Sequence, residues 1–169
     1  CALPICELLR DSAQKQEWRR LAVSAVPDWS RVLGGYRSCV DWPSAHYWPQ
    51  LADAFPEAKV ILTWRSAESW WRSFEQTILP RLLADTETEE TAPGSQLISL
   101  RVFGGRPLTR EHCLAVYEAN VAAVRARIAP DRLLVFELGE GWDKLCPFLG
   151  APVPAAAFPH RNTASDFQA

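Results

Sequence analysis

The chain of 169 residues has the length of one ordinary domain, and its 48% hydrophobic and 22% charged residues exclude an intrinsically disordered protein. A formal net charge of -2 provides no overall attraction for polyanions. We therefore expect neither nucleic acid nor a membrane surface as a partner.

Cysteine usage and hydropathy indicate a cytoplasmic protein. The cysteines lack C-x-x-C spacing and the histidine partners of a zinc site, and their odd number does not suit a disulfide framework. We therefore expect reduced thiols and no metal. The apolar runs are far shorter than the ~20 residues that a membrane-spanning helix needs. The cysteines are Cys1, Cys6, Cys39, Cys113 and Cys146.

The first third of the chain predicts two helices and a short strand. Residues 11–26 carry apolar side chains at helical spacing among charges, and Pro27 ends this helix. Residues 38–42 are typical of a short strand that Pro43 stops. A second, short helix is expected over residues 45–55.

The clearest strand is predicted at residues 59–64. The run is largely apolar and does not alternate, which is typical of a strand covered on both faces within a parallel sheet. Arg65 follows this strand, and Ser66 is a suitable N-cap for a helix that begins there. We expect this helix to end or kink near Pro80.

The second half of the chain predicts two helices and a strand after a long connection. Residues 85–107 are acidic and rich in threonine and glycine, with a short helix expected over residues 96–102. Such long loops are usually lids or binding loops, and the sequence does not decide whether this one closes over a site. Residues 109–129 predict an amphipathic helix, residues 132–138 a buried strand and residues 142–149 a last helix.

The alternation of strands and helices indicates one α/β domain over residues 1–169. We expect a three-layer α/β/α sandwich with a mainly parallel central sheet. Only three strands are evident in the sequence, whereas a sheet of this class has about five. The expectation is therefore that a first strand is missing and that the chain is a fragment.

The most informative pattern is an arginine at the carboxyl end of the strand at residues 59–64. Ligands of open α/β sheets bind at this edge, and a helix N-terminus offers free N–H groups to an anion. Ser73 lies about two helical turns after Ser66, on the same side of the helix. Arg65 and Ser73 could therefore converge on one phosphate group.

An arginine that ends a strand, with a serine eight residues later, resembles the 3′-phosphate-binding element of sulfotransferases that use 3′-phosphoadenosine-5′-phosphosulfate. Longer phrases resemble a bacterial-type family of this class that acts on small molecules. They occur in the order of that family over nearly the whole chain. The phrases cover residues 40–43, 55–65, 132–136, 141–142 with 145–150, and 158–160 with 162.

This resemblance implies a fold of the P-loop nucleotide-hydrolase type and a metal-free, in-line reaction. A sulfuryl group would pass from the nucleotide donor to a hydroxyl or amine of a small-molecule acceptor. Arg65 and Ser73 would bind the 3′-phosphate of the donor. Arg161, in the closing segment of the family, could touch the same phosphate, although a solvated tail is an equal alternative for it.

The general base that the resemblance implies is Asp41. Related cytosolic sulfotransferases carry a histidine two residues before a proline, and here Asp41 stands two residues before Pro43. Those relatives also carry a lysine two residues before the base, where this chain has Cys39. His46 is the alternative base, or a residue that lines the acceptor pocket.

Several of these residues also have simpler interpretations. Arg65 could pair with the nearby carboxylate of Glu68, and Asp41 could cap the turn ahead of Pro43. Three tryptophans near the proposed site could line an acceptor pocket, although most tryptophans belong to the core. These are Trp42, Trp70 and Trp71.

The family's donor loop, a glycine-rich turn between a strand and a helix, is not found in the sequence. Neither Gly34-Gly35 nor Gly104-Gly105 has the flanking hydroxyl residues or the context of such a loop. The chain as given is therefore expected to be incomplete and inactive. Two other functions stay open. One is a P-loop kinase-like phosphoryl transferase, with Asp41 on magnesium. The other is a non-catalytic, sulfotransferase-like interaction protein.

Overall fold

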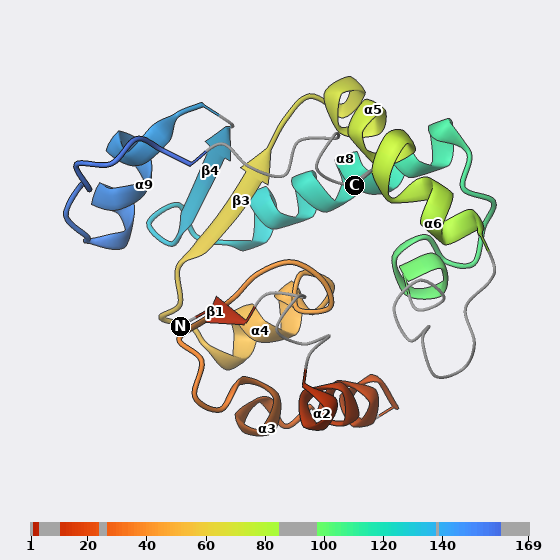
Figure 1. Cartoon of the computed structure of the whole chain (residues 1–169), viewed down its shortest axis with the longest axis horizontal. Coiled ribbons are helices and arrows are strands. Elements are labelled where there is room, and N and C mark those ends of the chain that lie inside the picture. Colours follow the sequence, from red (N-terminus) through yellow and green to blue (C-terminus); the bar gives the residue numbers. More distant parts are fainter. Residues whose placement is uncertain (1, 4–10, 24–26, 85–97, 138, 160–169) are drawn as a thin grey trace. The chain divides into compact units, whose positions relative to one another are not determined.

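A computed structural model describes residues 2–3, 11–23, 27–84, 98–137 and 139–159. The chain divides into two compact units, Cys1–Pro56 and Glu57–Ala169, each of which is considered by itself. Both units combine helices with a pair of parallel strands, as the predicted α/β class requires (Figure 1).

The described part of the N-terminal unit contains a short pair of strands and three helices. Strand β1 (Ala2–Leu3) runs parallel to β2 (Ser38–Cys39). The helices are α2 (Ser12–Val23), α3 (Trp29–Leu33) and α4 (Trp48–Ala54). The helix predicted from residue 11 is thus confirmed up to residue 23, and residues 24–26 lie outside the described part.

The strand predicted at residues 38–42 is shorter than expected. It ends at Cys39 because Asp41 has a φ of 67°, in the left-handed region, where an extended strand cannot continue. The helix predicted over residues 45–55 also starts later, at Trp48, after a series of turns. Pro49 lies in its first turn, where the missing N–H costs nothing.

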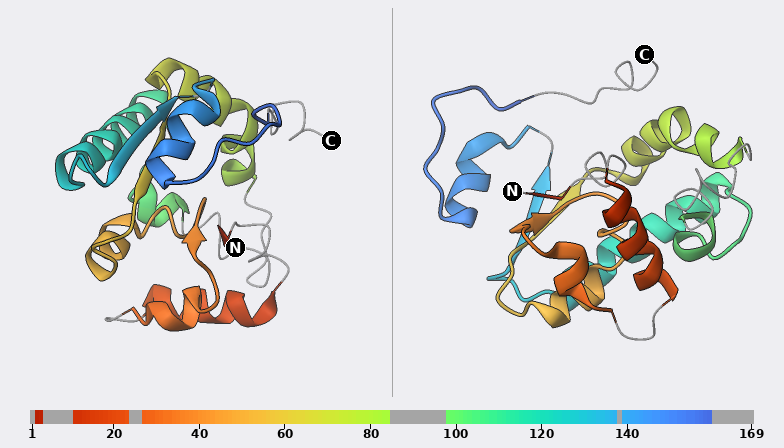
Figure 2. Two further views of the ribbon diagram at one scale, coloured as in Figure 1. Left: turned by 90° about the vertical axis from the view of Figure 1, so that its left-hand side faces the viewer. Right: turned by 60° about the horizontal axis from the view of Figure 1, so that its bottom comes forward.

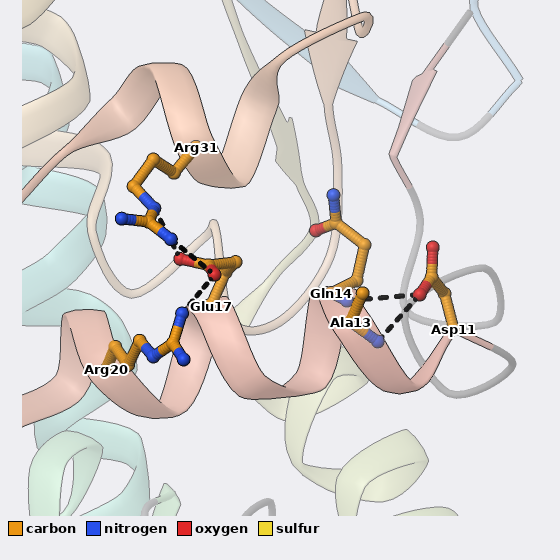
Figure 3. A network of polar contacts seen from close by, with 6 residues as sticks. All are labelled: Asp11, Ala13, Gln14, Glu17, Arg20 and Arg31. Carbon is orange, nitrogen blue, oxygen red and sulfur yellow. Dashed lines mark hydrogen bonds and ion pairs between the residues drawn. The ribbon is translucent and has the colours of Figure 1, made fainter.

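Helix α2 is stabilised by charged side chains at its start and at its centre. The carboxylate of Asp11 accepts hydrogen bonds from the main-chain N–H groups of Ala13, at 2.8 Å, and of the residue after it, and so caps the helix. Glu17 binds Arg20 at 2.6 Å in its own helix and Arg31 of α3 at 2.9 Å (Figure 3). The carboxylate of Glu17 therefore joins α2 to α3.

A small apolar core lies beneath this ion-pair network. Trp18 and Leu21, three residues apart on one face of α2, are buried together with Val32 of α3. The ring of Tyr47 lies 5.9 Å from that of Trp18 and extends the core toward α4. The partly buried residues around it are Trp29, Leu33, Tyr36, Cys39 and Tyr47.

The C-terminal unit is built around a longer pair of parallel strands. Strand β3 (Val60–Trp64) pairs in register with β4 (Leu133–Glu137). The helices between them are α5 (Ala67–Thr77), α6 (Leu79–Leu83), the π-helix η1 (Ile98–Val102) and α8 (Arg110–Arg127). A last helix, α9 (Gly141–Leu149), packs beside β4 (Figure 2).

These elements agree closely with the sequence prediction. The strands at residues 59–64 and 132–138 and the helices at residues 109–129 and 142–149 are confirmed within one or two residues at each end. The break expected near Pro80 is confirmed between α5 and α6. The short helix expected at residues 96–102 is η1, while residues 85–97 of the long connection lie outside the described part.

One expectation about β3 is wrong. The strand was predicted to be covered on both faces, but Ile61 is 40% exposed and Thr63 is exposed as well. Their neighbours on the same face of β4 are buried, because Phe158 after α9 packs on Phe136 at 5.9 Å. This cover reaches β4 and, among the described residues of the C-terminal unit, does not extend over Ile61.

The core of the C-terminal unit is an aromatic cluster between α5, η1 and α8. The ring of Phe74 lies 5.6 Å from that of Phe103 and 6.0 Å from that of Trp71. Cys113 of α8 is fully buried against them, and burial raises the pKa of its thiol. The partly buried residues around this cluster are Trp70, Ile78, Leu79, Leu82, Ile98, Val102, Leu108, Leu114 and Val116.

We expect Phe74→Ala to lower the free energy of unfolding by about 3 kcal/mol, because the substitution leaves a cavity among the other aromatic rings. Chemical denaturation measures this loss. The control is Leu83→Ala, at a side chain that is 63% exposed and should change stability by less than about 0.5 kcal/mol. Equal effects of the two substitutions would contradict the assignment of the core.

Candidate functional site

The predicted arginine stands at the carboxyl end of a strand and directly before a helix. β3 ends at Trp64, Arg65 follows, and Ser66 is the N-cap of α5. The hydroxyl of Ser66 accepts a hydrogen bond from the main-chain N–H of Ser69 at 3.3 Å. The remaining N–H groups of the first turn, together with the helix dipole, make this end of α5 electropositive.

The main chain of Arg65 is bound by a single side chain from α8. The hydroxyl of Tyr117 donates to the carbonyl oxygen of Arg65 at 2.8 Å and accepts from the N–H of Arg65 at 3.4 Å. In the sequence, Tyr117 was only one residue of the amphipathic helix predicted over residues 109–129. The one available signal was its phenol group, because a tyrosine hydroxyl within an apolar stripe usually has a hydrogen-bond partner.

Stacked aromatic rings hold Tyr117 in place. Its ring lies 4.7 Å from that of Trp70 with an interplanar angle of 16°, and Trp70 stacks on Phe74 at 4.8 Å and 13°. Trp70 therefore forms part of the contact between α5 and α8, and Trp71, which is 7% exposed, belongs to the core. For both residues the structure favours the core interpretation over an acceptor pocket.

The carboxylate of Glu68, the alternative partner expected for Arg65, pairs with another residue. Glu68 forms an ion pair with Arg110, the first residue of α8, and both side chains are more than half exposed. Within the part of the chain that the structure describes, the guanidinium of Arg65 has neither a hydrogen bond nor an ion pair. The interpretation that Arg65 pairs with Glu68 is therefore wrong in this structure.

Ser73 lies farther along α5 on the side of Ser66. The rise of a helix separates the two serines by about 10 Å along the axis. The main-chain carbonyl of Ser73 accepts a hydrogen bond from the hydroxyl of Thr77 at 2.6 Å, and its own hydroxyl bonds to no other described residue. Arg65 thus stands just before α5 and Ser73 lies two turns into it, and their convergence on a phosphate stays a prediction.

Asp41 occupies a special backbone position in the N-terminal unit. Its φ of 67° is uncommon for any residue except glycine, although aspartate tolerates it better than most. Its carboxylate accepts from the N–H of Trp42 at 2.7 Å, and its carbonyl accepts from the N–H of Ala45 and the hydroxyl of Ser44, both at 2.8 Å. Asp41 thus organises the turn, as one interpretation of the sequence proposed, while its side chain stays exposed.

His46 lies at the end of the same turn. Its N–H donates to the carbonyl of Pro43 at 3.0 Å, and its ring meets that of Tyr47 edge-on at 4.9 Å. The structure therefore places Asp41 and His46 within one turn of the N-terminal unit. Removal of a proton from an acceptor by Asp41 or His46 stays a prediction.

Cys39 replaces the lysine that the resemblance implied two residues before the base. Its side chain is partly buried, and desolvation raises the pKa of its thiol, although a hydrogen bond with Ser44 acts in the opposite direction. At neutral pH the thiol is protonated and uncharged. Cys39 therefore cannot supply the positive charge of the lysine.

Arg161, the remaining residue predicted for the nucleotide site, lies outside the described residues. No group of three or more histidine, cysteine, aspartate or glutamate side chains within the described ranges could hold a metal ion. No helix of the described chain is both long and apolar enough to cross a membrane.

Comparison with known proteins agrees with the resemblance found in the sequence. A family model described as a sulfotransferase domain matches residues 4–167. The chain is also 31% identical over 147 residues to the Ava biosynthesis cluster protein M of Aspergillus versicolor. This alignment covers 79% of the chain and 56% of the relative, so the chain spans about half the length of the curated relative that it matches.

We expect Ser66→Ala to lower the free energy of unfolding by about 1 kcal/mol, because the first turn of α5 loses its cap. Chemical denaturation is the measurement. Ser69→Ala is the matched control, since its hydroxyl does not cap the helix, and it should change stability by less than about 0.5 kcal/mol. A Ser66→Ala variant as stable as the control would show that the cap is not formed in solution.

Proposed function

We propose that this chain, which belongs to the sulfotransferase domain family, provides the 3′-phosphate site of an enzyme that uses 3′-phosphoadenosine-5′-phosphosulfate. The acceptor would be a hydroxyl or amine of a small molecule. The name of the relative assigns that protein to a biosynthesis cluster, and this fits an acceptor of low molecular weight.

The observation that carries this proposal is the guanidinium of Arg65, which has neither a hydrogen bond nor an ion pair with any residue that the structure describes. A partly buried arginine normally binds a carboxylate or a phosphate, because desolvation of a lone charge is unfavourable. Here the nearest carboxylate in the sequence, that of Glu68, is bound to Arg110 instead. Arg65 also stands where β3 meets the electropositive end of α5, so an incoming phosphate could bind the guanidinium and the helix N-terminus together.

The proposed fold follows from the same family. The parallel pair of β3 and β4, with α8 packed against β3, would form part of the central sheet of a three-layer α/β/α sandwich of the P-loop type. The donor's 3′-phosphate would bind at the carboxyl end of β3, where Ser73 offers a second donor group. Arg161 would be a further contact to this phosphate. We place the reaction in the cytoplasm, in keeping with the free thiols of the described cysteines.

The proposed chemistry is an in-line transfer without a metal. Asp41 would take the proton of the acceptor hydroxyl or amine while the acceptor atom attacks sulfur. The bond between sulfur and the bridging phosphate oxygen then breaks, and adenosine 3′,5′-bisphosphate leaves. The left-handed backbone of Asp41 supports this role, because uncommon backbone conformations concentrate at functional sites. His46 is the alternative base in the same turn.

We expect Arg65→Ala to weaken the binding of adenosine 3′,5′-bisphosphate at least tenfold, or about 1.4 kcal/mol. Isothermal titration calorimetry measures the affinity, and adenosine 5′-monophosphate, which lacks the 3′-phosphate, should be insensitive to the substitution. Arg72→Ala is the matched control, because Arg72 is an exposed arginine of the same helix. Failure of the protein to bind the bisphosphate, or equal binding by both variants, would overturn the proposed function.

Asp41→Asn should lower the rate of sulfuryl transfer by a factor of about 100 or more, because the amide cannot accept the proton. Asparagine also tolerates a positive φ, so the turn should be retained. Transfer of radiolabelled sulfate to a panel of phenols, alcohols and amines, measured in the protein expressed from its natural start, gives the rate, and nucleotide affinity serves as the control. A loss of rate in His46→Asn but not in Asp41→Asn would assign the base to His46.

A further inference from the structure

We propose that Tyr117 is a positioning residue of the nucleotide site: by binding the main chain of Arg65, its hydroxyl directs the guanidinium toward the 3′-phosphate. This inference rests on the proposed function, because it assumes that Arg65 binds that phosphate. It assigns a role to a residue of α8, which is separated in sequence from the junction of β3 and α5.

The main chain of Arg65 depends on Tyr117 because it belongs to neither neighbouring element. The ladder with β4 ends at Trp64, and the helical bonds of α5 begin at Ser66. Among the described residues, the N–H and the carbonyl of Arg65 have no partner other than the Tyr117 hydroxyl, at 3.4 and 2.8 Å. One phenol thus satisfies both main-chain groups of the residue.

The Tyr117 hydroxyl is itself well placed to act as a fixed point. Tyr117 lies within α8, an 18-residue helix, so its main chain is held by helical hydrogen bonds on both sides. Its ring stacks on Trp70, which stacks on Phe74 in the buried cluster. A ring held in this way keeps its hydroxyl at one position. The two hydrogen bonds of this hydroxyl then restrict the main chain of Arg65.

Fixing the main chain matters because the Arg65 side chain has neither a hydrogen bond nor an ion pair within the described chain. The direction of the side chain starts from its Cα–Cβ bond, and this bond follows the main-chain angles. Without Tyr117, the junction could rotate and the guanidinium would sample more orientations. Binding would then have to order the residue, at a cost in affinity.

The experiment is a double-mutant cycle on adenosine 3′,5′-bisphosphate binding, measured by isothermal titration calorimetry in the full chain. Tyr117→Phe keeps the stacked ring and removes only the hydroxyl. We expect it to weaken binding about three- to tenfold. The same substitution should have no further effect in the Arg65→Ala background. Tyr36→Phe, which removes a hydroxyl from the N-terminal unit, is the matched control and should leave affinity unchanged.

The outcomes separate this inference from the function on which it rests. If Arg65→Ala lowers the affinity for the bisphosphate and Tyr117→Phe leaves it unchanged, the role of Tyr117 is overturned and the proposed function stays intact. If Tyr117→Phe lowers the affinity equally in the unmodified chain and in Arg65→Ala, its effect is a general structural one, and the positioning role of Tyr117 is also overturned. No effect of Arg65→Ala overturns the proposed function and this inference with it.

A second variant covers the case in which Tyr117→Phe does not fold. Tyr117→4-aminophenylalanine keeps the stacked ring and a hydrogen-bond donor at the same place. Affinity within a factor of about two of the unmodified chain supports the positioning role, since the donor bond to the Arg65 carbonyl is restored. Affinity as low as that of Arg65→Ala would overturn it.

Discussion

Aromatic rings from α5 and α8 pack against one another, and this contact determines how the end of β3 is held. Trp70 and Phe74 of α5 meet Tyr117 and Cys113 of α8, so the two helices keep a fixed relation to the strand that leads into α5. The ion pair between Glu68 and Arg110 lies at the exposed end of the same contact. An exposed pair of this kind contributes little to stability. Its effect on the site is instead to occupy the carboxylate that Arg65 would otherwise bind.

The sequence predicted those elements that depend on local signals. β3 follows from an apolar run, α5 from the N-cap Ser66, and α8 from its helical spacing of apolar residues. The contacts that define the site join residues far apart in the chain, such as Tyr117 with Arg65, and no local pattern encodes them. The strand at β2 was predicted, but its early end at Cys39 was missed, because the left-handed backbone at Asp41 belongs to a residue type that also occurs in ordinary turns.

The two proposed parts of the site have different physical support. At Arg65 the support is electrostatic: a positive group without a counter-charge in the described chain, next to the positive end of a helix. At Asp41 it is conformational, because the residue adopts an uncommon backbone conformation while its carboxylate accepts a main-chain hydrogen bond from Trp42. The thiol of Cys39 adds no charge beside it. The proposed mechanism therefore requires that a cation other than Cys39 stabilise the sulfuryl group.

The backbone at Asp41 also restricts which side chains can occupy that position. A φ of 67° is tolerated mainly by glycine, asparagine, aspartate and histidine. Two of these four side chains, aspartate and histidine, can accept a proton, and they are the base proposed for this chain and the base of the cytosolic sulfotransferases that it resembles. One turn geometry can therefore present either base. During divergence of the family, the identity of the proton acceptor could change by a single substitution while the fold of the turn stayed the same.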